Sequence, residues 1–496
     1  METVDVKKWI TERIKPEQIE KYLVNGKDFI NEAEIESHLA ANRNPDPSRI
    51  RDIIAKSLSI TTLEPHETAA LLHVEDPAIL EEMREAALKI KRSVYDNRIV
   101  TFAPLYMSNL CVNGCLYCGF RDNNDCSKRR MLTMDEVRRE VEVLAGQIGH
   151  KRLIVVYGEH PTTGVDYVAE TIRTVYDLRV PTKKGHNSIR RVNVNMAPLQ
   201  IDELKMLRDV GIGTYQVFQE TYHKATYAKV HPAATLKGNY LWRLYCMHRA
   251  LEAGIDDVGI GALFGLYDWR FEVMGLIYHA RELESRCGIG PHTISFPRIE
   301  QAINTPYASE LPYNVSDADF LKLVTVIRLS VPHTGMIVTC REQAALKDKC
   351  ILSGCTQTDS SSQIGIGGYS ELGSVQEGER QQFILGDTRS LDTMIRDYAD
   401  MGMITSFCTA GYRCGRTGKC IMDMLRTGQE GKFCKLNAVI TFREWLDDFA
   451  SEKTKIAGEK IIQKEIDEIR EKSPKAFEQF MKTYIRTVNG ERDIYF

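Results

Sequence analysis

Between residues 96 and 375 the chain alternates short β-rich runs with amphipathic helical segments, and this pattern restricts the fold more than any other feature. Eight such runs, each followed by a crossover, are typical of a (β/α)8 barrel, which takes about 250 residues. The predicted strands are 99–105, 152–157, 191–196, 214–218, 257–264, 293–296, 336–340 and 357–366. We therefore expect an α/β protein built on a parallel eight-stranded TIM barrel.

The two flanks of the barrel read as helical. In residues 1–95, the segments 32–39 and 77–88 carry apolar residues at helical spacing, and Pro77 suits a first helical position. Residues 376–496 combine helices, a cysteine-bearing loop and a charged tail. We predict an N-terminal helical region (1–95), the barrel (96–375) and a mostly helical C-terminal domain (376–496). A helix over 459–472 would either face solvent or contact a second copy in a homodimer.

Three cysteines, Cys111, Cys115 and Cys118, follow the first predicted strand with the spacing C-x3-C-x2-C. Three thiolates in one short loop can each bind one iron of a [4Fe–4S] cluster and leave the fourth iron open to a small molecule. A structural zinc site needs a fourth ligand, and the next cysteine, Cys126, lies beyond a polar stretch. Cysteines buried only as small apolar residues would not stand between Asn and Gly. The sequence predicts an open [4Fe–4S] site.

The cysteine count and the net charge bear on the cellular location of the protein and on its classes of partner. Thirteen cysteines are an odd number and cluster at 111–126 and 408–434, which favours metal binding over disulfides and predicts a reducing, cytoplasmic location. A net charge of −3 gives no reason to expect nucleic-acid binding. No apolar run approaches the roughly 20 residues of a membrane span, so we expect no membrane partner.

Polar residues follow several of the predicted strands, where barrel enzymes place their chemistry. Gly158 and Glu159 follow the second strand, and a carboxylate there can bind an ammonium group, although a solvated Glu in a tight turn is the simpler alternative. Glu220 follows the fourth strand, in a polar segment in position for ribose or carboxylate contacts. Ser295 and Arg298 accompany the sixth, where a guanidinium could clamp a substrate carboxylate or form an ion pair.

These motifs resemble the radical S-adenosylmethionine (SAM) superfamily, in which the amino and carboxylate groups of SAM chelate the open iron. Tyr117 directly before the last cysteine fits that pattern, whereas Tyr157 stands where the superfamily's Gly-Gly-Glu element has its first glycine. The likeness is more specific to the HydG family of tyrosine lyases, which mature [FeFe]-hydrogenase, and looser to the ThiH family. The segments that carry it are Cys111–Phe120, Tyr157–Glu159, Arg191–Leu199, Gly254–Glu272, Gly290–Ile299 and Ser406–Gly418.

The resemblance implies a radical lyase that cleaves the Cα–Cβ bond of tyrosine to p-cresol and dehydroglycine. SAM would contact Tyr117, Gly158, Glu159 and Glu220, and a low-potential donor such as ferredoxin would supply electrons. Arg298 and Ser295 would hold the carboxylate of tyrosine or a similar amino acid. Two alternatives stay open: radical chemistry on another small molecule, and a noncatalytic iron–sulfur scaffold or carrier.

The C-terminal cysteines depart from the HydG pattern. That family carries a second cluster on C-x2-C-x22-C and makes CO and cyanide there, whereas here Gly411 replaces the middle cysteine between Cys408 and Cys434. Cys414 and Cys420 lie in the same loop and are candidate replacement ligands. The domain therefore holds a rewired cluster, or has lost it and leaves a tyrosine lyase without CO and cyanide chemistry, or keeps structural cysteines. The family pattern adds a histidine ligand at the opposite barrel mouth, for which His292 is the candidate.

Overall fold

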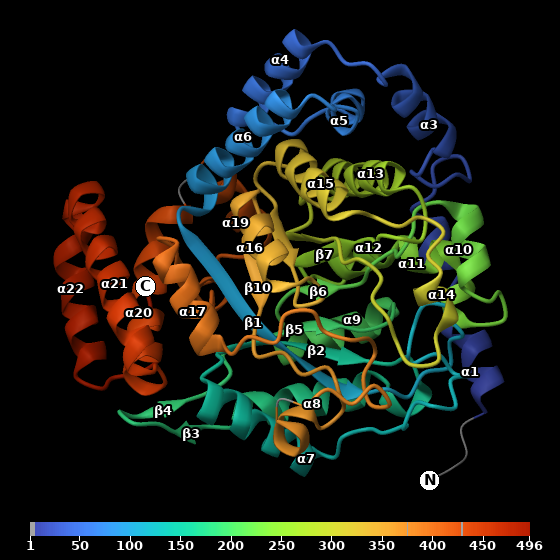
Figure 1. Ribbon diagram of the computed structural model, residues 1–496. Coiled ribbons are helices and arrows are strands. Elements are labelled where there is room, and N and C mark those ends of the chain that lie inside the picture. The colour runs from blue at the N-terminus through green and yellow to red at the C-terminus, as the bar shows by residue number, and fades with distance from the viewer. Residues whose placement is uncertain (1–4, 374, 428–429) are drawn as a thin grey trace.

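A closed barrel of eight parallel strands forms the centre of the molecule in the computed structural model, which describes residues 5–373, 375–427 and 430–496 (Figure 1). The strands pair in sequence order, and the last pairs with the first, Val100 opposite Gln357. This confirms the predicted fold. The barrel strands are β1 (Arg98–Ser108), β2 (Arg152–Tyr157), β5 (Arg191–Asn195), β6 (Tyr215–Gln216), β7 (Val258–Gly261), β8 (Thr293–Ser295), β9 (Gly335–Val338) and β10 (Gln357–Asp359).

The helices between the strands begin and end at the residues that local chemistry favours. In α7 (Met134–Val141), Thr133 and Glu136 form the reciprocal hydrogen bonds of a capping box. Gly211 ends α9 (Ile201–Val210) in the left-handed region, with φ +84°. The other principal crossover helices are α8 (Val165–Asp177), α12 (Cys246–Glu252), α13 (Trp269–Cys287), α15 (Asp317–Ser330) and α16 (Ala344–Leu352).

The chain before the barrel is helical, as predicted. Its longest helix, α6 (Pro77–Tyr95), begins with Pro77 after Asp76, whose carboxylate accepts from two backbone amides. Together with α3 (Glu32–Ala41), α4 (Pro47–Leu58) and α5 (Pro65–Leu72), it covers α13 and α15 of the barrel (Figure 1). Two short helices, α1 (Val6–Arg13) and α2 (Glu17–Glu20), precede them.

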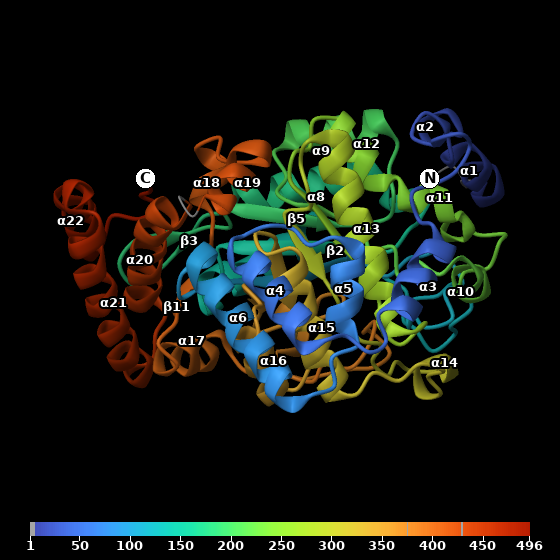
Figure 2. The ribbon, with the colours of Figure 1, turned by 90° about the horizontal axis from the view of Figure 1, so that it is seen from above.

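The C-terminal segment joins the barrel through β11 (Ile404–Ser406), which pairs with the first residues of β1. Helices α17 (Leu391–Asp400), α20 (Glu430–Asp448), α21 (Glu452–Lys472) and α22 (Pro474–Val488) pack together at that side of the molecule (Figure 2). The helix expected over 459–472 is the last two thirds of α21, whose apolar face packs within the same chain. The domain limits at 95 and 375 stay predictions.

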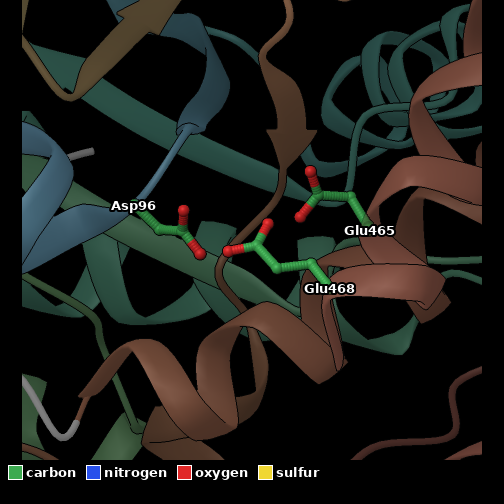
Figure 3. Close-up of side chains that lie close together, drawn as sticks. All are labelled: Asp96, Glu465 and Glu468. Atoms are coloured by element: carbon green, nitrogen blue, oxygen red, sulfur yellow. The ribbon is translucent and has the colours of Figure 1, made fainter. Parts of the chain in front are cut away.

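An ion-pair cluster links this helical layer to the start of β1. The carboxylates of Asp96, Glu465 and Glu468 point toward one another (Figure 3). The Lys435 Nζ lies 2.8, 2.9 and 2.5 Å from them, so an ammonium group already fills the place that a cation would take. The cluster is therefore a structural ion-pair network. Among the described residues, no helix is long and apolar enough to cross a membrane.

Candidate active site

The cysteine loop lies at the C-terminal mouth of the barrel and interlocks with the turn after β2. The Val112 amide donates to the Glu159 carbonyl at 2.8 Å. A Cβ on Gly158 would lie 2.1 Å from the Leu110 carbonyl oxygen, so only glycine permits this approach. These backbone contacts place Glu159 beside the three cysteines.

The three sulfurs line one cavity of about 230 Å³ at this mouth. Burial raises the pKa of the Cys115 thiol to about 12, and coordination to a metal would deprotonate it. A single tetrahedral ion would hold its sulfurs about 3.8 Å apart. In the described ranges no three cysteines have sulfurs within 4.8 Å of one another. This wider spacing fits a cubane, whose irons bind one thiolate each.

Hydrogen-bond donors face two of these sulfurs. The Asn113 amide group lies 3.7 Å from the Cys111 Sγ. The Cys118 Sγ accepts from the Phe120 amide at 3.4 Å and from the Gln382 side chain at 3.5 Å. Donors at the sulfurs are usual around iron–sulfur clusters, whose reduction potentials they help to set.

Glu159 presents a carboxylate oxygen to the cavity. Its Oε2 accepts from the Asn113 amide at 2.6 Å, whereas its buried Oε1 has no hydrogen-bond partner among the described residues. Burial raises the pKa of Glu159, partly offset by the Asn113 hydrogen bond. An unpartnered buried carboxylate oxygen is costly, and a ligand ammonium group would satisfy it.

Glu220 and Tyr117 also line the cavity. The Glu220 carboxylate lies 2.7 Å from the Lys237 ammonium and 3.0 Å from the Arg243 guanidinium. Burial alone would raise the pKa of Glu220, but these two cations bring it below its ordinary value. The Tyr117 hydroxyl lies 2.8 Å from the His231 Nε2, which fixes the ring. Because His231 directs its other ring nitrogen at the Tyr227 carbonyl, the hydroxyl is the donor.

The structure separates the two residues predicted to hold a carboxylate. Ser295 lines the cavity, but Arg298 does not. The Arg298 guanidinium instead binds Glu342 and lies 2.9 Å from Asp317. Its donors thus already serve two carboxylates, and the clamp predicted for Arg298 stays a prediction.

Arg341 is a second arginine that follows a barrel strand at this mouth. It lines the cavity just beyond β9 and lies 3.4 Å over the Phe383 ring. No carboxylate of the described residues lies within ion-pair distance of it. Burial lowers its pKa, and a bound carboxylate would restore it. The sequence signal for Arg341 was the same as for Arg298, a cation directly after a strand.

Other residues of the cavity escaped prediction because they lie away from the strand ends. Lys237 and Arg243 come from the helical segment after β6, and Gln382 comes from beyond β10. Glu300 also lines the cavity, and burial raises its pKa to about 7. Only the fold brings these polar groups to the cysteines.

The C-terminal cysteines lie around the other mouth of the barrel. Cys408 and Cys434 are half-buried, whereas Cys414 and Cys420 are exposed. The Cys414 Sγ donates to the Phe496 carbonyl at 3.5 Å, and Gly411 contributes only backbone to α18 (Ala410–Arg413).

His292 directly precedes β8 at this same end. Burial alone would raise the pKa of Asp257. Nearby groups, His292 first among them, instead bring it below its ordinary value. The role of His292 as an iron ligand stays a prediction.

Comparison with known proteins agrees with this geometry. Residues 105–274 match the Radical SAM superfamily, and residues 295–404 match the Biotin and Thiamin Synthesis associated domain. The chain is similar to the protein in a crystal structure of HydG, a maturase of the [FeFe]-hydrogenase, with 46% sequence identity and a TM-score of 0.89. The match covers 95% of this chain and 100% of that one. The chain belongs to the HydG family of radical SAM enzymes. Membership implies a [4Fe–4S] cluster and SAM.

Two further relatives support the assignment. The HydG of Carboxydothermus hydrogenoformans is 36% identical with a TM-score of 0.76, and the match covers 91% of this chain and 96% of that one. The 2-iminoacetate synthase of Escherichia coli (strain K12) is 29% identical over 341 residues, which are 68% of this chain and 84% of that protein.

Proposed function

We propose that this chain is a radical SAM lyase that cleaves the Cα–Cβ bond of tyrosine to p-cresol and dehydroglycine. One observation carries the proposal. A single cavity joins the three cysteines and the unpartnered Glu159 oxygen to Arg341, an arginine without an ion-pair partner among the described residues. Similarity to HydG and to 2-iminoacetate synthase supports the same reaction class.

The residues at the cysteine end fit the cofactors. Cys111, Cys115 and Cys118 would hold the [4Fe–4S] cluster, which supplies the electron for reductive cleavage of SAM. Glu159 would accept from the SAM ammonium group, because its Oε1 has no other donor. Tyr117 and Glu220 complete this end, the latter kept ionised by Lys237 and Arg243.

The other end of the cavity suits an aromatic amino acid. Arg341 would bind the carboxylate in bidentate fashion, with Ser295 beside it on the wall. Deeper in the barrel, Phe102, Ile154 and Ile337 form a buried apolar cluster that also lines the cavity. This surface would pack against the ring of the substrate and exclude water from the reacting bond.

We further propose that the reaction ends at dehydroglycine, without CO or cyanide formation. Gly411 removes one of the three cysteines of the HydG motif, and a glycine has no side-chain donor. Exposed Cys414 directs its thiol at a backbone carbonyl, and Cys420 is also exposed. A rewired cluster on Cys408, Cys414 and Cys434 would require this loop to rearrange.

Anaerobic incubation of the reconstituted protein with SAM, dithionite and tyrosine tests both proposals. We expect p-cresol and 5′-deoxyadenosine in equal amounts, and no free CO or cyanide. Phenylalanine in place of tyrosine is the matched control for recognition of the hydroxyl group. Consumption of a different amino acid would contradict the substrate, and a cluster without any SAM cleavage would instead support a scaffold or carrier.

A further inference from the structure

A segment beyond the last barrel strand, residues 376–389, lies across the cysteine loop; we call it the strap. The Lys128 amide donates to the Glu379 carbonyl at 2.9 Å, and the Gly386 amide donates to the Cys340 carbonyl at 2.9 Å. A Cβ on Gly119 would lie 2.6 Å from the Gln382 carbonyl oxygen, so glycine lets the strap reach the loop. The strap is therefore fixed to both the loop and the barrel.

The side chain of Gln382 bridges a barrel tyrosine and a cluster ligand. Its Oε1 accepts from the Tyr106 hydroxyl at 3.0 Å, and its Nε2 lies 3.5 Å from the Cys118 Sγ. Burial raises the pKa of Tyr106, so this hydroxyl keeps its proton and donates. A thiolate bound to iron has no proton and can only accept. Both neighbours therefore require the same orientation of the amide.

We propose that Gln382 is a positioning residue that sets the reduction potential of the cluster, with Tyr106 holding its amide toward Cys118. One-electron reduction adds negative charge to the cluster and its thiolates. A hydrogen bond to sulfur stabilises the reduced state more than the oxidised state and raises the potential. The inference rests on the cluster that the proposed function places at these cysteines.

The strap also lies beside the part of the cavity that the proposed function assigns to the substrate. Phe383 and Leu385, directly beyond Gln382, line the same cavity, and Phe383 lies under Arg341. One short segment thus contacts both the cluster ligand and the wall assigned to the substrate.

Redox titration of the reconstituted full-length protein, followed by electron paramagnetic resonance without SAM or amino acid, tests the inference. For Gln382→Leu we expect the equilibrium constant for one-electron reduction to fall about tenfold, a shift of about 59 mV to lower potential. Gln382→Glu should shift the potential further in that direction, because it adds negative charge beside the sulfur. Tyr106→Phe should produce a smaller shift of the same sign, because it removes only the group that orients the amide.

Gln376→Leu is the matched control. Gln376 accepts from the Leu385 amide at 2.9 Å and supports the strap without contacting a sulfur. We expect the reduction potential of the cluster in Gln376→Leu to equal that of the wild type. An equal shift in Gln376→Leu would attribute the effect to strap packing and overturn the inference.

A cluster-loaded Gln382→Leu protein with unchanged potential would also overturn it. If that variant does not fold, an unchanged potential in Tyr106→Phe decides against the inference in the same way. Neither result would contradict the proposed lyase activity. A wild-type protein that binds no cluster would contradict the proposed function itself.

Discussion

Glu159 shows how one unsatisfied atom predicts a ligand. Its Oε1 is buried without a donor, and SAM offers an ammonium group. We predict that Glu159→Gln weakens SAM binding about tenfold or more, because a charge-assisted hydrogen bond contributes about 1.5–3 kcal/mol. Equilibrium dialysis of SAM against the anaerobic, cluster-loaded protein measures this. The iron content should equal that of the wild type, and unchanged SAM affinity would show that Glu159 does not bind the ammonium group.

Arg298 and Arg341 provide a matched pair for the carboxylate site. Arg341→Gln should raise the KM for tyrosine about tenfold or more while leaving thermal stability near that of the wild type, because Arg341 has no carboxylate partner among the described residues. Arg298→Gln should leave KM nearly unchanged and lower stability by about 3 kcal/mol, because it strands the buried carboxylate of Glu342. Steady-state kinetics and thermal unfolding of both variants measure the contrast. The reverse pattern would return the clamp to Arg298.

The sequence could predict which residues follow a strand but not which way their side chains point. Arg298 and Arg341 both come just after a barrel strand, but Arg298 binds Glu342, Asp317 and the Val315 carbonyl outside the cavity. Those partners are distant in sequence, so no local pattern reveals them. The cysteines and Gly158–Glu159 were predictable because their spacing and backbone geometry are local.

At the level of elements, hydrophobic pattern and capping signals located all eight barrel strands. The predicted β6 run covers 214–218, but only Tyr215–Gln216 pair as a strand. Thr214 and Phe218, at the two ends of the predicted run, continue the barrel wall without regular strand pairing. Strand limits depend on pairing partners, which a single sequence does not contain. The helix ends were sharper, because caps such as Thr133 and Gly211 act locally.

Helix α13 contains a buried acid that should make stability depend on pH. Glu272 accepts from the Thr221 hydroxyl and from the Tyr222 amide, yet burial raises its pKa to about 8. The unfolded chain releases this proton near pH 4.5. Between those values the folded state binds more protons, so stability falls as pH rises, by about 1.4 kcal/mol per pH unit from this group. We expect the loss to end above the folded pKa.

Glu272→Gln should remove that component of the pH dependence. Thermal unfolding of wild type and variant at pH 5 and pH 8 measures it. The wild type should lose more stability than the variant over this interval, because the amide does not titrate. Parallel stability curves for the two proteins would show that Glu272 ionises normally in the fold.

At the scale of the whole molecule, the two mouths of one barrel carry different cysteine sets. The first set lies after β1 with its sulfurs in a cavity, whereas the second follows β11 with two thiols exposed and Gly411 in place of a ligand. The same chain therefore keeps the three-cysteine motif of its family and alters the C-terminal motif. The altered motif is visible in the sequence, and the fold adds that Cys414 and Cys420 are exposed.

Iron counting separates the two ends. We predict that the anaerobically reconstituted wild type binds about four irons, as one cubane requires. The variant with Cys111, Cys115 and Cys118 all changed to Ala should bind none, and a Cys408→Ser, Cys434→Ser double variant should keep about four. This result follows if three thiolates at the first mouth hold the only cluster. About four irons left in the triple variant would instead reveal a rewired second cubane, and formation of CO or cyanide would then have to be measured again on that protein.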